Sequence, residues 1–407
     1  MQPTPQGAKI TRLTQGHFAE LDGLRGLAIL LVVVYHFFLP YKGFHSADPA
    51  WPLQAAQAGW MGVDLFFVLS GFLITGILME TREQPHYFRN FLGRRFLRIW
   101  PLYYLSLVVL LVLLPAVMPS IPPELQSMRD KQIWFWLYGA NWLFASEGGF
   151  AHTSGGYFWS LAVEEQFYLV WPFVVYALSR RALLRFSLAL LAVSLVSRVV
   201  LTQMGVNGNV LYTMTFTHLD GLAVGSSLAI LLRSPDTAER VAKLMPAVAL
   251  AAALGLVAVR LADGNAFFWS RNMAAYGYTL IVVLFGSLLV HVAIGGARAR
   301  VARWIFSRGF MTQCGKYSYA LYMVHVPIAS LLYPLVMRHL DRFKPIIGYE
   351  GLFIIFFAVA FAVSWGVAVA SWYLFERHVL ALKRHFSYVG EARAPEASRS
   401  GPGTPQR

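Results

Sequence analysis

The stretch LDGLRGLAILLVVVYHFFLP, residues 21–40, decides the fold class and raises the first functional question. From Leu24 to Pro40 it is almost entirely aliphatic or aromatic, as in a helix that crosses a lipid bilayer. It nevertheless carries Arg25 near its start and His36 near its end. Ionisable residues inside membrane spans are costly and usually face a bundle interior or a water-filled cavity, so both are candidates for function.

The composition of the whole chain agrees with a membrane protein. Of the 407 residues, 57% are hydrophobic and only 13% are charged, whereas about a quarter of a soluble domain is charged. We therefore predict an all-α integral membrane protein of about ten transmembrane helices. The segments long and apolar enough to cross a bilayer are 24–40, 60–79, 99–118, 158–178, 182–203, 210–232, 244–262, 273–294, 316–338 and 351–375.

The distribution of basic residues predicts the orientation of these spans. If the N-terminus is cytoplasmic, 24 of the 34 Lys and Arg residues lie in inner segments and seven in outer ones. Positive charge concentrates on the cytoplasmic side, so we predict that both termini are cytoplasmic and that the chain is a multi-pass protein of a bacterial-type inner membrane. No cleavable signal peptide is expected. The predicted divisions are a cytoplasmic tail (1–20), a transmembrane domain (21–380) and a cytoplasmic tail expected to be disordered (381–407).

Charge and cysteine content exclude other classes of protein. The net charge of +14 does not indicate nucleic-acid binding, because the basic residues form short runs between apolar stretches. The single cysteine, Cys314, allows neither an internal disulfide nor a thiol metal site, and no metal is predicted.

Several spans carry polar residues at comparable depth. His36 lies four residues before the outer end of its span, which is about 6 Å at 1.5 Å per residue. Asp64, Glu164 and Glu165 lie four to seven residues from the outer ends of two other spans. This pattern is typical of a histidine general base oriented by carboxylates, although a hydrogen-bonded histidine beside a snorkelling arginine is the simpler alternative.

Two further observations extend this candidate site. Arg25 and His36 are eleven residues apart, so they share one helix face about 16 Å apart. Arg94, Arg95 and Arg98 lie at the start of a predicted span, where the helix dipole disfavours cations; an anionic ligand such as a phosphate would compensate. Deeper polar residues, His218, Asp220 and His325, are expected to extend a polar tunnel inward.

Five sequence stretches together resemble the membrane-bound acyltransferase-3 family. They are the opening stretch, GVDLFFVLSGFLIT (62–75), RRFLRIWPLYY (94–104), WSLAVEEQFYLVWP (159–172) and YSYALYMVHVP (317–327), and the resemblance covers about residues 20–380. It implies O-acylation of sugars and related acceptors by acyl-CoA. It further implies that His36 is the central catalytic residue paired with Arg25, that Arg95 and Arg98 serve the donor, and that Glu164, Glu165 and Ser70 belong to the site. One departure is THLDGLAVG (217–225), where His218 stands in place of the family's usual arginine.

The predicted function is transfer of an acyl group, acetyl by default, from cytoplasmic acyl-CoA to a hydroxyl of a carbohydrate, a lipid-linked sugar or another glycosylated acceptor, such as a cell-envelope polysaccharide. The assigned residues are His36, Glu164, Glu165 and Asp64 for catalysis, Arg25, Arg94, Arg95 and Arg98 for the donor, and Ser70, Asp220 and His325 for the tunnel. Membrane lipid is the expected surrounding. The resemblance also implies that onward transfer would need another protein, because some members carry a further domain after the spans. Direct transfer and an acyl-His36 relay both stay open, and a proton-coupled secondary transporter of a polar solute is the alternative from another class.

Overall fold

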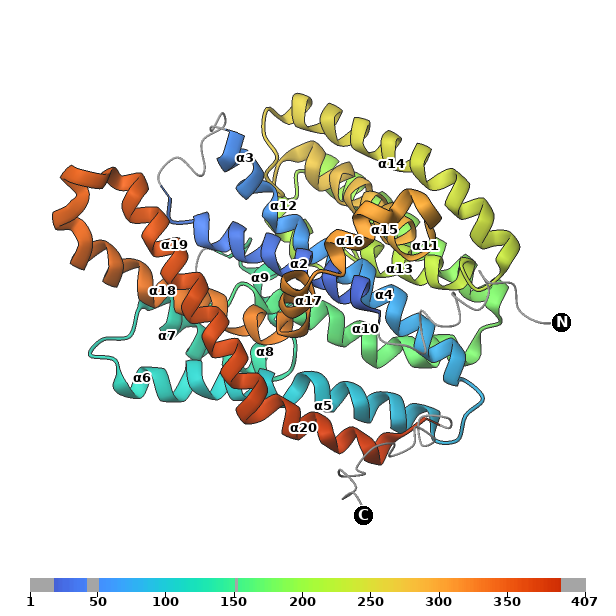
Figure 1. Cartoon of the computed structure of the whole chain (residues 1–407), viewed down its shortest axis with the longest axis horizontal. Coiled ribbons are helices and arrows are strands. Elements are labelled where there is room, and N and C mark those ends of the chain that lie inside the picture. Colours follow the sequence, from blue (N-terminus) through green and yellow to red (C-terminus); the bar gives the residue numbers. More distant parts are fainter. Residues whose placement is uncertain (1–17, 42–50, 151–152, 389–407) are drawn as a thin grey trace, which may run out of the picture.

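The protein is a bundle of helices, shown by a computed structural model that describes residues 18–41, 51–150 and 153–388 (Figure 1). The described residues contain no strand, which agrees with the predicted all-α class. The longer helices, in chain order, are α2 (Ala19–Phe38), α4 (Gly62–Thr81), α5 (Tyr87–Val108), α10 (Phe158–Ala177), α11 (Arg180–Gln203), α13 (Asp220–Leu231), α14 (Pro235–Asp263), α15 (Tyr278–Ile294), α18 (Ser318–Leu340) and α19 (Lys344–Ser371).

Shorter helices connect or flank these. They are α3 (Trp51–Gln57), η1 (Ala58–Met61), η2 (Val109–Leu113), α6 (Leu114–Val117), α7 (Pro123–Asp130), α8 (Gln132–Trp136), α9 (Ala140–Ser146), α12 (Gly208–Thr213), η3 (Met273–Gly277), η4 (Gly296–Ala299), α16 (Arg300–Phe306), α17 (Gly309–Lys316), η5 (Asp341–Phe343), η6 (Trp372–Glu376), α20 (Arg377–Ala381) and η7 (Leu382–Phe386).

Seven helical stretches within the described residues are long and apolar enough to cross a membrane. The last stretch, Ser318–Phe386, includes both α18 and α19, which run back along each other as a hairpin (Figure 1). Helix α10 is not among the seven, and α13 is a shorter apolar helix. The chain is thus a multi-span membrane protein, while the number of ten and the cytoplasmic position of the termini stay predictions.

The predicted span 210–232 is wrong as one continuous helix. Residues 214–219 are not helical and separate α12 from α13. Other helices satisfy the backbone there: Asn141 donates to the carbonyl of Thr213, and Arg198 donates to that of Thr217. Irregular backbone is tolerated at membrane depth when protein side chains supply its hydrogen bonds, which the apolar pattern of the sequence does not reveal.

The centre of the bundle is a close crossing of α4 and α13. A Cβ atom added at Gly71 would overlap the backbone carbonyl of Leu222, and one added at Gly225 would overlap that of Val68. Glycine on both helices therefore lets the two backbones touch, as small residues do at membrane helix crossings. Helix α2 packs beside α4 and places its C-terminal turn next to α18.

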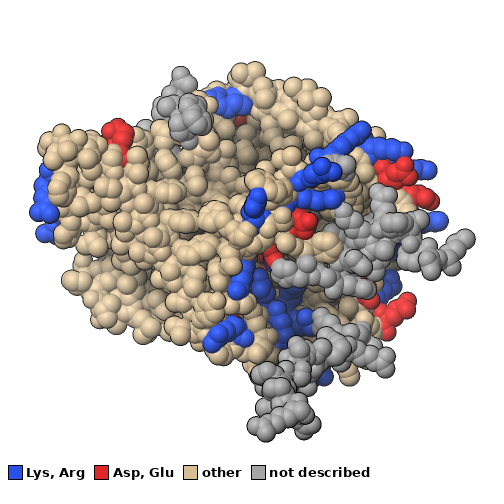
Figure 2. Space-filling view, in the orientation of Figure 1, with Lys and Arg blue, Asp and Glu red and all other residues tan. Residues whose placement is uncertain are grey.

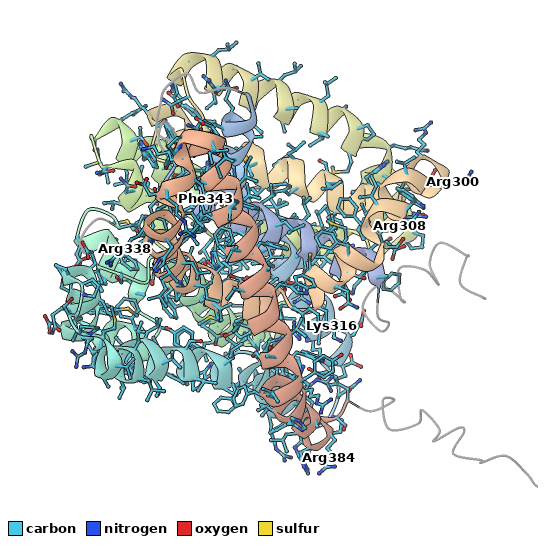
Figure 3. The ribbon with its side chains drawn as sticks, turned by 60° about the vertical axis from the view of Figure 1, so that its left-hand side comes forward. Arg300, Arg308, Lys316, Arg338, Phe343 and Arg384 are labelled. Atoms are coloured by element: carbon cyan, nitrogen blue, oxygen red, sulfur yellow. The ribbon has the colours of Figure 1, made fainter. Side chains whose placement is uncertain are left out.

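The outer surface is apolar along the helices and basic at one end. Large exposed apolar residues lie on α10, α14 and α19, for example Val170, Leu254 and Ile354. In Figure 2 most Lys and Arg gather toward the right of the view, where α4 ends, and a smaller group lies at the opposite end. Figure 3 places Arg300 and Arg308 on the side opposite Arg338. This distribution suits a protein that exposes its flank to lipid.

The C-terminal segment is more ordered than expected. The predicted tail 381–407 was expected to be disordered, but α20 and η7 continue the chain alongside the first part of α5 (Figure 1). Residues 377–386 therefore pack against α5, while the division of the chain into a domain and two tails stays a prediction. Residues 389–407, and residues 1–17 of the predicted N-terminal tail, lie outside the described residues.

Candidate functional site

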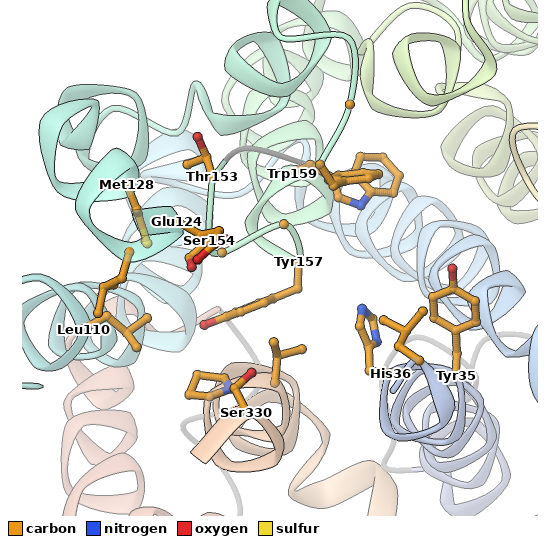
Figure 4. A pocket seen from close by; sticks show the side chains of 18 of the residues that line it. Tyr35, His36, Leu110, Glu124, Met128, Thr153, Ser154, Tyr157, Trp159 and Ser330 are labelled. Carbon is orange, nitrogen blue, oxygen red and sulfur yellow. The ribbon is translucent and has the colours of Figure 1, made fainter. Parts of the chain in front are cut away.

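A large cavity of about 1140 Å³ opens beside the C-terminal turn of α2. Ligand pockets are typically ~300–1,000 Å³, so this one is ample for a sugar-sized group. His36 projects from α2 into it, and residues from α7, from the start of α10 and from α18 form the other walls (Figure 4). The lining is largely aromatic and aliphatic, with a few polar side chains: Glu124, Glu147, Thr153, Ser154, Asn209 and Ser330.

The hydrogen bonds of His36 assign its tautomer. Its Nδ1 lies 2.9 Å from the carbonyl oxygen of Val32 and 3.2 Å from Nε2 of His325. The Nδ1 of His325 in turn lies 2.8 Å from the carbonyl oxygen of Tyr322, so that nitrogen carries a hydrogen and Nε2 is an acceptor. Nδ1 of His36 must then be the donor, and its Nε2 keeps a lone pair. His36 therefore has the form of a base.

The partner of His36 differs from the prediction. The sequence suggested that Glu164, Glu165 or Asp64 orients the imidazole, but its side-chain hydrogen-bond partner is the fully buried His325 of α18. Equal depth along separate helices did not bring these groups together, because the direction in which each helix turns its side chains decides the contact. His325 was expected to line a tunnel; it stands behind His36 and is not among the residues lining either cavity.

A second, smaller cavity of about 80 Å³ holds the arginines. Arg25, Arg95 and Arg98 line it, from α2 and α5. Arg25 is 3.9 Å from Asp22, whereas Arg95 and Arg98 form no ion pair with a carboxylate among the described residues. Arg94 points elsewhere, toward the C-terminal segment. Arg25 and His36 thus share one face of α2 as predicted and reach two different cavities.

The two adjacent glutamates of α10 have different hydrogen-bond partners and lie in different surroundings. Ser70 donates to Glu164 Oε1 at 2.7 Å, and the Tyr168 hydroxyl donates to Ser70 at 2.9 Å, all three on the wall of the smaller cavity. Glu165 instead accepts from the indole of Trp100 at 3.0 Å. Adjacent helical residues point about 100° apart, so the pair does not form one site. Glu164 belongs with the arginines, and Glu165 lines neither cavity.

One wall separates the two cavities. Val63 and Tyr322 line both of them. The hydroxyl of Tyr322 donates to the carbonyl oxygen of Tyr157 at 2.9 Å and is also hydrogen-bonded to Ser160. These bonds fix the phenol ring between the cation-lined cavity and the cavity of His36.

The remaining candidates form a buried polar cluster outside both cavities. Asp64 is 2.9 Å from Nε2 of His218, and Asp220 is 2.8 Å from the guanidinium of Arg198; all four side chains are fully buried. Asp220 was expected to line a tunnel, but it lines neither cavity. Asp64 was expected beside His36 and is paired with His218 instead. The geometry makes these residues internal ion and hydrogen-bond partners between α4, α11 and α13.

Sequence reasoning missed three features of the site. The His36–His325 contact joins residues 289 positions apart, and the hydrophobic pattern of α18 gives no sign of it. Tyr322 was quoted within a motif but given no role. Glu124 and Asn209 line the large cavity from connecting segments, which were given no role because they lie outside the predicted membrane spans.

The fold and these two cavities describe a helical membrane protein that holds a histidine with a free Nε2 lone pair on one side of a wall and a cluster of arginines on the other. A family model described as an acyltransferase domain, that of the acyltransferase-3 family, matches residues 18–369. The chain belongs to this family, which confirms the predicted family and enzyme class.

Two relatives of known description are similar over most of the chain. The peptidoglycan O-acetyltransferase OatA of Listeria monocytogenes is 30% identical over 343 residues, which cover 81% of this chain and 52% of that protein. The O-acetyltransferase OatA of Staphylococcus aureus is 28% identical over 323 residues, covering 76% of this chain and 50% of that protein. The chain thus spans about half the length of these relatives. No solved structure matches it.

Proposed function

We propose that this chain moves an acetyl group from acetyl-CoA, bound on the cytoplasmic side of the inner membrane, to a sugar hydroxyl of the cell envelope. The observation that most supports this proposal is the pair of cavities on either side of the Tyr322 wall. One cavity is lined by cations, and the other contains His36. The names of the two relatives favour a peptidoglycan sugar, or its lipid-linked precursor, as the acceptor. Family membership gives no support to the transporter alternative.

The smaller cavity suits the donor. The guanidinium groups of Arg95 and Arg98 have no carboxylate in ion-pair contact within the described part of the chain, and guanidinium binds phosphate through paired, charge-assisted hydrogen bonds. With the phosphates held there, the pantetheine arm would extend along the face of α2 from Arg25 toward His36. The thioester would reach Nε2 of His36 once Tyr322 moves aside.

The large cavity suits the acceptor. Aromatic rings such as Trp159 and Tyr157 supply flat apolar surface for a sugar ring, and Glu124 and Asn209 supply hydrogen-bonding groups. In direct transfer, Nε2 of His36 takes the proton of the sugar hydroxyl while its oxygen attacks the thioester carbon. The C–S bond breaks, and the proton finally neutralises the departing thiolate. His325 accepts from Nδ1–H throughout and stabilises the imidazolium.

The relay uses the same lone pair. Nε2 of His36 attacks the thioester carbon, the C–S bond breaks, and an acyl-imidazole holds the group until a sugar hydroxyl takes it. The two routes differ in what happens without acceptor. A rapid burst of free CoA, equal in amount to the enzyme, is expected of the relay only.

The test is acceptor-dependent release of CoA by purified protein in lipid nanodiscs. A thiol reagent reports CoA cleanly, because the single cysteine of the chain, Cys314, is buried. Acetyl-CoA is supplied with a soluble peptidoglycan fragment, and acetylated sugar is measured by mass spectrometry. The His36→Asn variant should lose transfer while its melting temperature is unchanged.

A matched control removes a histidine outside the site. His339 is exposed on α18 and contacts only a carbonyl of its own helix among the described residues. The His339→Asn variant should retain wild-type rates. Normal transfer by the His36→Asn variant would refute the assignment of His36, and absence of transfer from acetyl-CoA by the wild-type protein would refute the donor.

A further inference from the structure

The segment after the last span folds back onto the start of α5. The side-chain amide of Asn90 donates to the carbonyl of Ser387 at 3.0 Å, and Arg94 donates to that of Phe386 at 3.4 Å. The ring of Phe386 lies against Gly93, where any added Cβ would collide with it, and Arg89 lies 5.6 Å from the ring centre. Residues 382–388 therefore have a docking place on α5.

This docking brings Lys383 to the arginine cluster. Lys383 is half-buried in η7, which packs on α5, and this position exposes it to repulsion from the arginines of that helix, above all Arg98 and Arg95. The next residue, Arg384, is exposed and is paired with His385. Of these two adjacent cations, Lys383 is thus the less exposed, whereas Arg384 lies at the outer end of the segment (Figure 3).

The nearby carboxylates do not explain this arrangement. Asp22 is 3.9 Å from Arg25, and Glu164 and Glu376 also attract arginines of the cluster, but these are three carboxylates facing five cations. Among the described residues, Lys383 has no ion pair with any carboxylate. A cytoplasmic flank needs positive charge, but exposed cations such as Arg384 already provide it. The cluster therefore keeps a surplus of positive charge, which an anion of several charges would compensate.

We propose that Lys383 is a binding residue for the phosphate groups of the acyl donor, and that the η7 segment clamps those groups against α5. This inference rests on the proposed function, in which the donor is a CoA thioester. Its pyrophosphate and ribose phosphate supply several negative charges within reach of one cluster. The arginines approach from the membrane side, and Lys383 closes the site from the cytoplasmic side.

The test compares two single variants that remove the same charge one residue apart. The Lys383→Gln variant should raise KM for acetyl-CoA about ten- to thirtyfold, as expected for loss of one charge-assisted contact to phosphate at the lower end of its usual range. Its kcat should be unchanged, since the arginines beside Lys383 line the cavity on the opposite side of the Tyr322 wall from His36. The Arg384→Gln variant should leave both constants unchanged, and the Lys383→Arg variant should restore KM.

A second variant tests the clamp itself. The Gly93→Val substitution displaces Phe386 and should raise KM as the Lys383→Gln variant does. If both act by removing the same lysine from the site, the double variant should be no worse than either single one. Multiplied effects would overturn the clamp, because they would show that the two residues act independently.

Two further arms identify the ligand. Replacing acetyl-CoA by its dephospho form, which lacks the ribose phosphate, tests whether Lys383 contacts that phosphate. If it does, the wild-type and Lys383→Gln proteins should have similar KM for the dephospho form. Nanodiscs with and without anionic lipid separate donor phosphate from a lipid headgroup. An effect of the Lys383→Gln variant that occurs only with anionic lipid overturns the proposal.

The Arg98→Gln and Lys383→Gln variants together distinguish an error about Lys383 from an error about the donor. If the Arg98→Gln variant raises KM and the Lys383→Gln variant does not, the donor is correct and Lys383 is not part of its site. If neither variant changes binding of CoA, measured directly by calorimetry, the arginine cluster does not hold the donor and the proposed function fails with it.

Discussion

Replacing His325 by leucine should slow acyl transfer about ten- to thirtyfold without changing KM for the donor. Nδ1–H of His36 has two acceptors, the Val32 carbonyl at 2.9 Å and Nε2 of His325 at 3.2 Å. When Nε2 of His36 takes up a proton or an acyl group, the ring becomes positive and both bonds become charge-assisted. Hydrogen bonds to charged groups contribute about 1.5–3 kcal/mol, and the longer, shared bond belongs at the lower end, about 1.5–2 kcal/mol. At about 1.4 kcal/mol per factor of ten, this gives the stated loss in kcat.

The assay is the thiol-release measurement with saturating acceptor, repeated for a variant that keeps an acceptor in place. Glutamine has its terminal oxygen near the position of the Nε2 atom that it replaces, so the His325→Gln variant should recover most of the rate. Both variants should melt within a few degrees of each other, because His325 is enclosed by protein in either case. An unchanged kcat in the leucine variant, or equal losses in both variants, would refute the positioning role.

Three other predictions concern the polar cluster, the helix crossing and the wall. The Asp220→Leu variant leaves the buried guanidinium of Arg198 uncompensated and should lower the free energy of unfolding by about 3–5 kcal/mol, whereas Lys243→Gln at an exposed pair should leave the thermal midpoint unchanged. The Gly225→Val variant drives a side chain into the backbone of α4 and should reduce the yield of folded, monodisperse protein in size-exclusion chromatography. The Tyr322→Phe variant loses the hydroxyl bonds that hold the wall and should increase hydrolysis of acetyl-CoA without acceptor; unchanged hydrolysis would contradict this role.

Much of the helical architecture follows from the sequence because lipid imposes a simple rule. A spanning segment must be apolar and must satisfy its own backbone, so long apolar runs predict helices. The rule fails at residues 214–219, where side chains of Asn141 and Arg198 replace the helical hydrogen bonds. It also says nothing of residues 381–386, whose helical turns pack against α5.

The site was predictable within one helix and not between helices. The angle of 100° per residue correctly placed Arg25 and His36 on one face of α2. Which neighbour meets that face depends on the tilt and rotation of separate helices, so the contact with His325 could not be read from spacing. The same limit explains why Glu164 lies with the arginines and Asp64 with His218, although the sequence suggested a place beside His36.

The Tyr322 wall also has a consequence for the electrical potential across the membrane. A charge moved through a potential of about 100 mV releases about 2.3 kcal/mol, so any continuous water path across the bilayer dissipates stored energy. The chain has cavities on both sides of one phenol ring and hydrogen bonds that hold that ring in place. In the proposed route, Tyr322 would move aside to admit the narrow thioester arm, and the arm itself would then fill the gap. On the proposed route, an enzyme built in this way would pass an acyl group outward without opening a path for protons.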